Sequence, residues 1–318
     1  MEDKQWKKMK IDLSKIKTYS IKERFSKVKE NSFAKACAKG SSFSAFYKSL
    51  PQILKANDFK AVVDAIATAK KKGKPVIFMM GAHVIKCGLS PLVIDLIQKK
   101  VITTVVFNGA GIIHDFEIAY QGKTSEDVGE ALKDGSFGMG RETAVFLNNA
   151  VNEGLKRGLG IGSSVGSAIA KERLKYKEHS ILYCCYKENI PACVQVAIGT
   201  DIIHQHHSFS GAATGEASQR DFLTLVTSIA KLGSGGAVLN FGSSVILPEV
   251  FLKALNLARN VGHKVYNFTS ANFDMIYHYR PAVNVVSRPT QDSGKGYYII
   301  GHHEIMLPFL HRAVIERI

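Results

Sequence analysis

From residue 51 to the end of the chain, two kinds of apolar pattern take turns. The first is a short, unbroken apolar run such as Val76–Met80. It is typical of a strand covered on both faces, because a half-exposed strand would alternate polar and apolar positions. The second is a longer segment such as Ala56–Lys72, in which apolar residues recur three or four positions apart, as on one face of a helix. The chain therefore predicts alternating strands and helices.

This alternation predicts an α/β fold with a mostly parallel sheet and helices on both faces, because parallel strands are joined by right-handed helical crossovers. No repeat or low-complexity linker interrupts the pattern, so residues 51–318 are expected to form a single domain. The predicted strands are Val76–Met80, Val101–Phe107, Ser180–Cys185, Ala192–Ile198, Ala237–Phe241 and Lys264–Phe268, with further short ones at Val283–Val286 and Tyr297–Ile300. The predicted helices are Ala56–Lys72, Leu92–Gln98, His114–Tyr120, Arg141–Arg157, Ser164–Tyr176, Gln219–Leu232, Pro248–Asn260 and His302–Ile318.

The first 50 residues show neither pattern and are predicted to form a basic arm in front of that domain. The formal net charge is +15, and residues 1–100 hold 22 Lys and Arg against 8 Asp and Glu, a net of +14. Such an excess suits a nucleic acid. Scattered lysines without interleaved aromatic motifs favour a solvated surface instead, so no nucleic-acid partner is expected. The aromatic residues expected to anchor the arm are Trp6, Phe25, Phe33, Phe43, Phe46 and Tyr47.

Hydropathy and cysteine usage predict a cytoplasmic protein. No apolar stretch reaches the roughly 18–20 residues of a membrane span, and the first ten residues lack the apolar core of a secretory signal. The five cysteines, Cys37, Cys87, Cys184, Cys185 and Cys193, are odd in number and have no CxxC spacing. They are therefore expected to be free thiols in a reducing compartment.

Candidate chemistry is sought where strands end, because ligands bind at the carboxyl ends of the strands in an open parallel sheet. The predicted strand Val101–Phe107 is followed by Asn108–Gly111 and then by His114 and Asp115. The small residues would let the backbone approach a phosphate, with helix N–H groups as donors, and Asp115 would accept ribose hydroxyls. The alternative is a tight turn in which Asp115 merely suits the positive end of a helix.

Three further strand ends carry polar or small residues. Thr200 and Asp201 follow the strand at 192–198, Gly242 and Ser243 follow the strand at 237–241, and a polar segment from Thr269 to Asp274 follows the strand at 264–268. Together with Asn108–Gly111, these four ends indicate a ligand groove along one edge of the sheet.

Two more tempting motifs are given less weight. His204, His206 and His207 invite a metal interpretation, but so short a stretch splits its imidazoles between faces and no acidic residue has HExxH spacing, so no metal is predicted. Gly158–Gly166 is similar to a dinucleotide fingerprint, but its glycine spacing is wrong and it follows a helix instead of a strand. It is predicted to be a flexible loop between helices that would be able to act as a lid.

Five blocks of this sequence, taken in order, resemble the deoxyhypusine synthase family, and the match runs from Val76 to the C-terminus. The block Val105–Asp115 resembles the family's TTAGGVEED, and Val238–Val245 resembles its ILGGGV. The order and spacing of the blocks is more specific than any one of them. The blocks are Val76–Phe78 with His83–Leu89, Val105–Asp115, Ile190–Asp201, Val238–Val245, and Phe268–Asp274 with Arg280 and Pro281.

The resemblance implies a Rossmann-like, NAD-binding fold and a homotetramer. It also implies transfer of an aminobutyl group from a polyamine such as spermidine to an amine, with Lys295 as the imine-forming lysine and His114 as a second catalytic residue. Carboxylates suit such a substrate, since each desolvated ammonium needs a paired charge. The residues that the resemblance places near cofactor or substrate are His83, Asn108, Ala110, Gly111, Asp115, Thr200, Asp201, Gly242, Ser243, Thr269, Ser270 and Asp274.

The chain also departs from the family pattern. Pro248 stands where the family has a substrate-site histidine, the family's tryptophan is absent, and Lys295 matches the catalytic lysine only across an insertion. The chain therefore resembles a divergent, bacterial-type member. Three functions stay open: an NAD-dependent aminoalkyl transferase, an NAD-binding enzyme with different redox or lyase chemistry, and a binding or regulatory protein that uses the basic arm.

Overall fold

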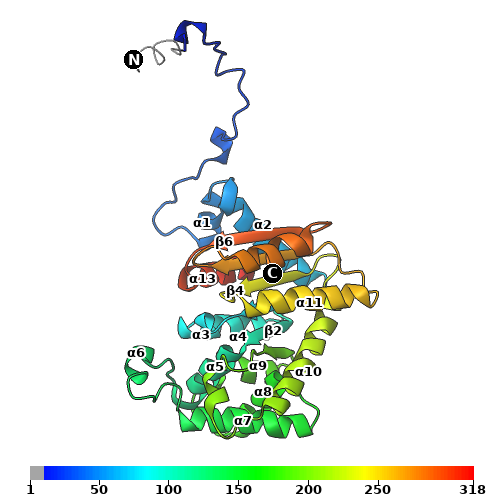
Figure 1. Cartoon of the computed structure of the whole chain (residues 1–318). Helices are drawn as coiled ribbons and strands as arrows, with labels where there is room; N and C mark the ends of the chain where they lie inside the picture. Colours follow the sequence, from blue (N-terminus) through cyan, green and yellow to red (C-terminus); the bar gives the residue numbers. More distant parts are fainter. Residues whose placement is uncertain (1–10) are drawn as a thin grey trace, which may run out of the picture.

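The computed structural model describes residues 11–318 and contains a six-stranded sheet (Figure 1). All neighbouring strands are parallel, in the order β3-β2-β1-β4-β5-β6. This is the doubly wound, Rossmann-like arrangement, in which the strand order reverses between β1 and β4. It confirms the predicted α/β class. The strands are β1 Val76–Met80, β2 Thr104–Asn108, β3 Ala192–Gln195, β4 Ala237–Phe241, β5 Thr269–Asp274 and β6 Lys295–Ile300.

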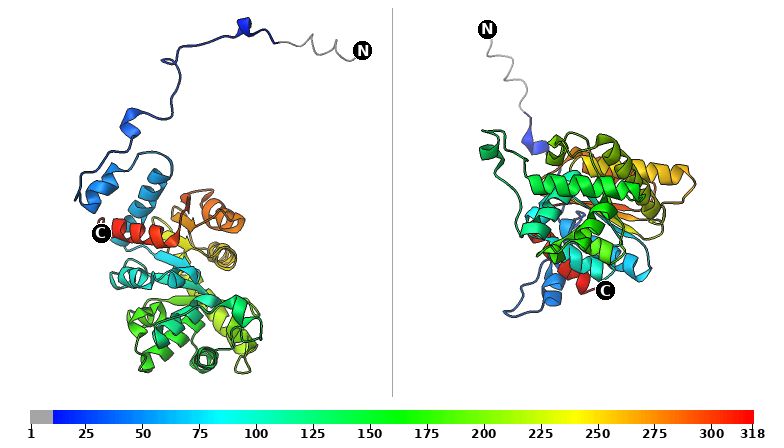
Figure 2. Two further views of the ribbon diagram at one scale, coloured as in Figure 1. Left: turned by 90° about the vertical axis from the view of Figure 1, so that its left-hand side faces the viewer. Right: turned by 90° about the horizontal axis from the view of Figure 1, so that it is seen from below.

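Helices cover both faces of the sheet, as the left view of Figure 2 shows. Helices α2, α4, α5 and α13 contribute to one buried cluster and α11 to the other, while α10 contributes to both. The α-helices are α1 Phe43–Ser49, α2 Leu54–Lys71, α3 His83–Lys86, α4 Ser90–Gln98, α5 Gly109–Gln121, α6 Val128–Ala131, α7 Arg141–Lys156, α8 Ile161–Lys171, α9 Ile181–Lys187, α10 Gly211–Ala230, α11 Ile246–Asn260, α12 Tyr279–Pro281 and α13 His303–Ile315. The 3₁₀ and π segments are η2 Leu13–Lys15, η3 Glu30–Ser32, η4 Lys177–His179, η5 Ile202–Gln205, η6 Ala282–Ser287 and η7 Arg288–Thr290.

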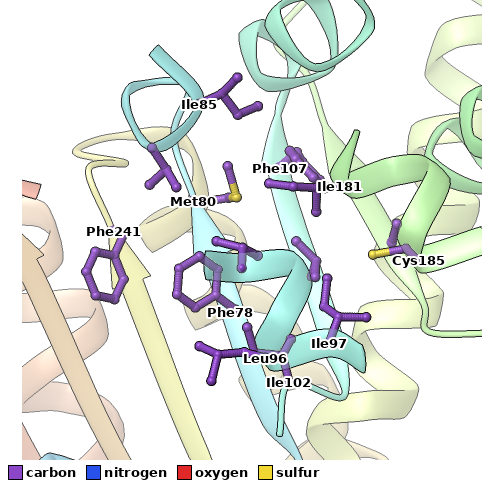
Figure 3. Packing of buried hydrophobic residues seen from close by; sticks show 14 of the residues in the cluster. Phe78, Met80, Ile85, Leu96, Ile97, Ile102, Phe107, Ile181, Cys185 and Phe241 are labelled. Atoms are coloured by element: carbon purple, nitrogen blue, oxygen red, sulfur yellow. The ribbon is translucent and has the colours of Figure 1, made fainter. Parts of the chain in front are cut away.

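Alternate side chains of each central strand enter different clusters, which explains why the strands are unbroken apolar runs. In β1, Phe78 and Met80 pack in the larger cluster, while Ile77 and Met79 pack in the smaller one on the other face. Figure 3 shows Phe78 beside helix α4, on the side toward Phe241. Aromatic rings continue this layer across the sheet, since Phe78 stacks on Phe241 with ring centroids 5.0 Å apart.

The predicted strand Ser180–Cys185 is wrong, because these residues enter helix α9. A short apolar run does not by itself separate a buried strand from a buried helix. Here the start of the helix is determined by capping. The Ser180 side chain accepts from the N–H of Tyr183, and a buried carboxylate, Asp115, accepts from the N–H groups of Ile181 and Leu182.

Two predictions near the C-terminus also need correction. Val283–Val286 lies in the π-helix η6, not in a strand. The strand expected at Lys264–Phe268 begins only at Thr269, so the polar segment from Thr269 to Asp274 is the strand β5 itself. A strand this polar is stable in the interior because its side chains find partners, as when Ser270 Oγ donates to the carbonyl of Val285 at 2.6 Å.

The glycine-rich segment 158–166 is not a flexible loop, because most of it forms the start of α8. A Cβ on Gly162 would lie 2.0 Å from the carbonyl oxygen of Ala192 in β3, and one on Gly166 would lie 2.7 Å from that of Leu182 in α9. These glycines therefore let α8 pack closely against the sheet and against α9. No side chain larger than hydrogen fits there.

Residues 11–29 extend away from the α/β domain (Figures 1 and 2). The carbonyl of Ser32 accepts from the N–H of Gln52, and the N–H of Lys35 donates to the carbonyl of Ser49. Of the predicted anchors, Phe43 and Tyr47 pack on Phe309 of α13, with ring centroids 5.7 and 6.0 Å away. Phe46 also contacts Phe309 but stays 45% exposed. Phe25 and Phe33 are 83% and 58% exposed and anchor nothing, which corrects the prediction, and Trp6 lies outside the described residues.

None of the helices within residues 11–318 is both long enough and apolar enough to cross a membrane.

Candidate functional site

The carboxyl ends of the parallel strands form one edge of the sheet, hereafter the carboxyl edge. Ten of the residues predicted for the site follow those ends, so the fold brings them to this edge. They are His83 after β1; Asn108, Ala110, Gly111, His114 and Asp115 at the end of β2 and in α5; Thr200 and Asp201 after β3; and Gly242 and Ser243 after β4. Asp274, the last residue of β5, lies at the same edge.

Thr269, Ser270 and Lys295 lie at the opposite edge, which corrects their assignment to the site. Thr269 pairs with Ala237 and with Lys295, so all three residues stand at the amino ends of their strands. The exposed side chain of Lys295 is separated from the carboxyl edge by the whole length of β6, roughly 16 Å at about 3.3 Å per residue. Lys295 is therefore too far from the carboxyl edge to form an imine there, and that prediction is wrong for this structure.

Asp115 is at the correct edge but does not face a ligand. Its side chain is fully buried, and its oxygens accept from Ser180 Oγ at 2.5 Å and from the N–H groups of Ile181 at 2.7 Å and Leu182 at 3.2 Å. Burial raises the pKa of Asp115 to about 6, against those three hydrogen bonds, which lower it. The carboxylate caps α9, so the ribose contact predicted for it is wrong.

The N-terminus of α5, predicted to bind a phosphate, is occupied by the protein itself. Asn108 caps the helix, with its side-chain oxygen accepting from the N–H of Gly111 at 3.1 Å. The Asp201 carboxylate packs against the first helical residue, since a Cβ on Gly109 would lie 1.9 Å from Asp201 Oδ2. An amide cap and a carboxylate leave no room for a pyrophosphate at this helix end.

A cavity of about 620 Å³ opens beside α5, and it contains four of the predicted residues: Ala110, His114, Thr200 and Asp201. The long connection between α5 and α7, including Thr124 and Phe137, forms another part of its wall. This volume lies within the range of about 300–1,000 Å³ that small-molecule sites occupy. The charged side chains that line it are Lys86, Lys123, Glu117, Glu126, Glu142 and Asp201.

A hydrogen-bonded chain runs along one wall of this cavity. His114 Nδ1 lies 2.6 Å from Thr124 Oγ1, and Thr124 Oγ1 donates to Glu117 Oε2. The other carboxylate oxygen, Glu117 Oε1, accepts from Thr143 Oγ1 at 3.1 Å. Burial lowers the pKa of His114 more than the nearby Glu117 raises it, and Lys86 and His83 lower it further. His114 is therefore a neutral imidazole at neutral pH.

Asp201 differs from Asp115 and Asp221 because one of its buried oxygens is left without a partner. Among residues 11–318, Asp201 Oδ2 and His204 Nε2 are buried polar atoms with no hydrogen-bond partner, and they lie 3.8 Å apart. His204 Nδ1 accepts from the N–H groups of Gly199 and Asp201, which leaves the hydrogen on Nε2. Burial raises the pKa of Asp201 to about 6.

The remaining histidines of this segment do not join His204. His206 Nε2 lies 2.9 Å from the carbonyl oxygen of Gly138, and His207 is exposed. In the part of the chain that the structure describes, no three His, Cys, Asp or Glu side chains are arranged to hold a metal ion.

At the reversal of strand order, the turns after β1 and β4 touch each other. A Cβ on Gly81 would lie 2.6 Å from the carbonyl oxygen of Gly242. Gly242 itself has φ +68°, and a Cβ there would lie 2.6 Å from His303 Nε2. Ser243 is buried, with its hydroxyl accepting from the N–H of Leu247. Glycine at 81 and 242 is therefore required by the packing of the protein on itself.

His303, at the start of α13, was not predicted and lies within this part of the edge. Its side chain is 4% exposed, and Nδ1 has no hydrogen-bond partner among the described residues. Burial lowers its pKa, while Asp274 raises it and His83 lowers it. Asp274 is buried as well and lies 3.8 Å from His278 Nε2. His303 was not predicted because β6 is short and lacks the unbroken apolar run that marks the central strands, so its end was not identified as a strand end.

Glu117, Thr124 and Thr143 were also missed by sequence reasoning. Each is a common polar residue in helical or loop context, with no spacing that marks it. The sequence did contain one signal for Glu117: it stands three residues after His114, and residues three apart share a helix face. The connection that brings Thr124 back onto that face is a tertiary feature.

Fold and edge together define a doubly wound α/β protein with a cavity at its carboxyl edge. Its fold is similar to that of ArgZ, an arginine dihydrolase from the ornithine-ammonia cycle in Cyanobacteria, in an apo structure (TM-score 0.51, 16% identity, 82% of this chain and 31% of that one). The chain thus spans less than a third of ArgZ.

Two further solved structures have a similar fold. One is a candidate deoxyhypusine synthase from Entamoeba histolytica (TM-score 0.51, 11% identity, 87% of this chain and 94% of that one). The other is a candidate LOR/SDH protein from Methanococcus maripaludis S2 (TM-score 0.50, 14% identity, 88% of this chain and 71% of that one). No protein-family model and no curated protein sequence matches the chain. At 11–16% identity these similarities concern the fold alone.

Proposed function

We propose that this chain is an NAD-dependent enzyme that acts on an amine at the carboxyl edge. The observation that carries the proposal is the wall of the cavity, where a neutral histidine held by a threonine and a glutamate faces the same space as Asp201. The Rossmann-like strand order, which in general binds dinucleotides at this edge, supports the cofactor. The candidate deoxyhypusine synthase of similar fold is the reason to consider polyamines first.

The cofactor would lie along the edge and not on the N-terminus of α5, which is filled. Asp201 lines the cavity, and its carboxylate would accept from a ribose hydroxyl once Oδ2, which is buried against Gly109, turns toward the cavity. Ala110 and Thr200 line the same cavity, and His83, Gly242 and Asp274 continue the edge toward β5. When bound, NAD supplies a hydride acceptor for the carbon next to the amine nitrogen.

The residues of the chain would handle protons and charge. The carboxylates of Glu117, Glu126 and Glu142 face the cavity and would attract a cationic amine. His114 would take the proton of the substrate ammonium, because hydride loss needs the nitrogen lone pair to be free. Loss of hydride and proton together leaves a carbon–nitrogen double bond in the substrate.

Aminoalkyl transfer then requires a second amine to add to that double bond and to expel the first amine, after which the returned hydride completes the product. With Lys295 at the opposite edge, no lysine of this chain is assigned to carry the group. We assign that role to neither Lys86 nor Lys123, which line the cavity, and take the acceptor to be a free amine. The same placement favours the second candidate, in which water adds in place of the acceptor and the reaction is redox or lyase chemistry without deoxyhypusine synthase activity.

The homotetramer, the cytoplasmic location and the absence of a nucleic-acid partner stay predictions of the sequence. Light scattering of the purified protein checks the first. Residues 11–318 contain free thiols only, and Cys184, Cys185 and Cys193 are buried, as suits a reducing compartment.

Titration calorimetry with NAD, and with NADP as a comparison, tests the cofactor. We expect binding of NAD to the wild type, binding about tenfold weaker or worse in Asp201→Asn, and unchanged binding in Lys295→Ala. An amine panel that includes spermidine and putrescine, followed by NADH absorbance and mass spectrometry, then distinguishes transfer from oxidation. Absence of NAD binding, in a sample shown to contain no copurified nucleotide, would overturn the proposal.

A further inference from the structure

The three side chains along the cavity wall allow only a few placements of their hydrogens. A threonine hydroxyl has a single hydrogen and accepts through its lone pairs, whereas an ionised glutamate only accepts. Glu117 receives hydrogen bonds on both oxygens, one from Thr124 and one from Thr143. The hydrogen of Thr124 Oγ1 is thus used on Glu117.

This placement determines which nitrogen of His114 has the hydrogen. Because Thr124 Oγ1 has no second hydrogen to give, its short contact of 2.6 Å with His114 Nδ1 requires Nδ1 to be the donor. A neutral imidazole with hydrogen on Nδ1 has a lone pair on Nε2. Among residues 11–318, Nε2 has no hydrogen-bond partner, and it is not one of the buried unpartnered atoms.

The elements around His114 bring both signs of charge to it. Glu117 lies on α5 itself, Lys86 and His83 belong to α3, and Asp201 comes from the loop after β3. Lys123, Glu126 and Glu142 line the same cavity from the connection after α5 and from α7. Glu117 is the only one of these groups joined to the imidazole through a hydrogen-bonded residue, so it is the group that compensates a positive charge on His114.

We propose that Glu117 and Thr124 are positioning residues that hold His114 with its hydrogen on Nδ1, so that Nε2 accepts a proton from an ammonium group in the cavity. The inference rests on the proposed function for its substrate and deepens it: the site takes its amine in the protonated form. The proton moves from the substrate nitrogen to Nε2, and the resulting imidazolium donates through Nδ1 toward Thr124 and Glu117.

The first test reads the tautomer and needs no activity. In protein with ¹⁵N-labelled histidine, long-range ¹⁵N–¹H correlation spectra distinguish a protonated Nδ1 from a protonated Nε2, and His114→Gln identifies the signal. We expect the Nδ1–H form in the wild type and in Thr124→Ser. Thr124→Val, which has no acceptor, should shift the population to the Nε2–H form. Thr227→Val, the same substitution at an exposed position of α10, is the control and should not change the population.

Either the Nε2–H form in the wild type or an unchanged Nδ1–H form in folded Thr124→Val would overturn the inference. Circular dichroism and thermal unfolding of each variant show whether it folds. Thr143→Val is a second variant in the hydrogen-bonded chain, since it removes one bond to Glu117 and leaves the contact between Thr124 and His114 in place. It should keep the wild-type tautomer.

The second test uses turnover of NAD with an amine. We expect kcat/KM to fall about 10²-fold or more in His114→Gln and about tenfold in Thr124→Val, with recovery in Thr124→Ser. In Glu117→Gln the acid limb of the pH profile should move to lower pH, since loss of the negative charge lowers the pKa of His114. An acid limb that does not move in Glu117→Gln would contradict the proposed coupling of Glu117 to His114 through Thr124. No turnover in wild type with the expected tautomer would instead overturn the proposed function.

Discussion

Asp115 and Asp201 look alike by sequence and by most local measures, yet they do different things. Both follow strand ends at the carboxyl edge, both are buried, and burial raises the pKa of each to about 6. The oxygens of Asp115 receive three hydrogen bonds from α9 and its cap. Asp201 keeps one oxygen without a partner, beside the cavity.

Burial and a raised pKa are therefore common to a carboxylate that caps a helix and to one with an unpartnered oxygen, whereas the number of hydrogen-bond donors separates the two. A buried oxygen with its donors in place is part of the fold, because removing it would strand those donors. A buried oxygen without donors has unmet hydrogen-bonding capacity, which a ligand is able to satisfy. Asp221 belongs with Asp115, since its Oδ2 accepts from the N–H groups of Gly162 and Val194.

Asp115→Ala should have the largest effect on stability. The substitution leaves the N–H groups of Ile181 and Leu182 and the hydroxyl of Ser180 without their acceptor. We expect the free energy of unfolding to fall by about 3–5 kcal/mol, measured by urea denaturation. A loss below about 1 kcal/mol would mean that these donors find other partners and would remove the basis of the comparison.

Asp221→Asn should have a smaller effect, with a dependence on pH. Burial raises the pKa of Asp221 to about 7 from an ordinary value of 3.8, so the folded chain binds the proton more tightly than the unfolded chain. The resulting contribution to stability is fully present below about pH 4 and is lost as pH rises to about 7.

The asparagine variant has no such proton to bind. The stability advantage of the wild type, about 1–3 kcal/mol, should therefore be larger at about pH 5 than at about pH 8. Denaturation of both proteins at the two pH values measures this difference. An advantage that grows with pH would show that the ionised form is the one the fold stabilises.

Asp201→Ala tests the other carboxylate of the comparison and should cost much less stability than Asp115→Ala. The substitution removes the cap of the short segment η5 but strands no donor at Oδ2, so we expect the free energy of unfolding to fall by only about 1 kcal/mol. Parallel denaturation of Asp115→Ala is the control for the measurement. A loss as large as that of Asp115→Ala would show that capping of η5 is its main role and would count against its role toward a ribose.

Lys295→Ala should have the smallest effect of all. The side chain is exposed at the amino end of an edge strand, so unfolding free energy should change by less than about 0.5 kcal/mol and turnover should be unchanged. Loss of activity without loss of stability would return this lysine to the reaction and would contradict the separation of the two sheet edges.

Much of the fold follows from local pattern, because a strand covered on both faces needs an unbroken apolar run. Val76–Met80 and Ala237–Phe241, predicted from such runs, are the central strands β1 and β4 with unchanged bounds. The carboxyl edge as the place to look follows from the same parallel order. Where the run is ambiguous, as at Ser180–Cys185, or polar, as in β5, the prediction failed.

By itself, then, the sequence determined the class of fold and the edge of the sheet where chemistry would gather. Only the tertiary structure decided which polar side chains are free to act there. Strand register places Lys295 and Thr269 at the amino ends of their strands, on the edge opposite the cavity. The donors that occupy Asp115 come from Ser180 and the residues after it, 65 to 67 positions away in the chain. Whether a polar atom is partnered depends on such distant contacts, which no local pattern records.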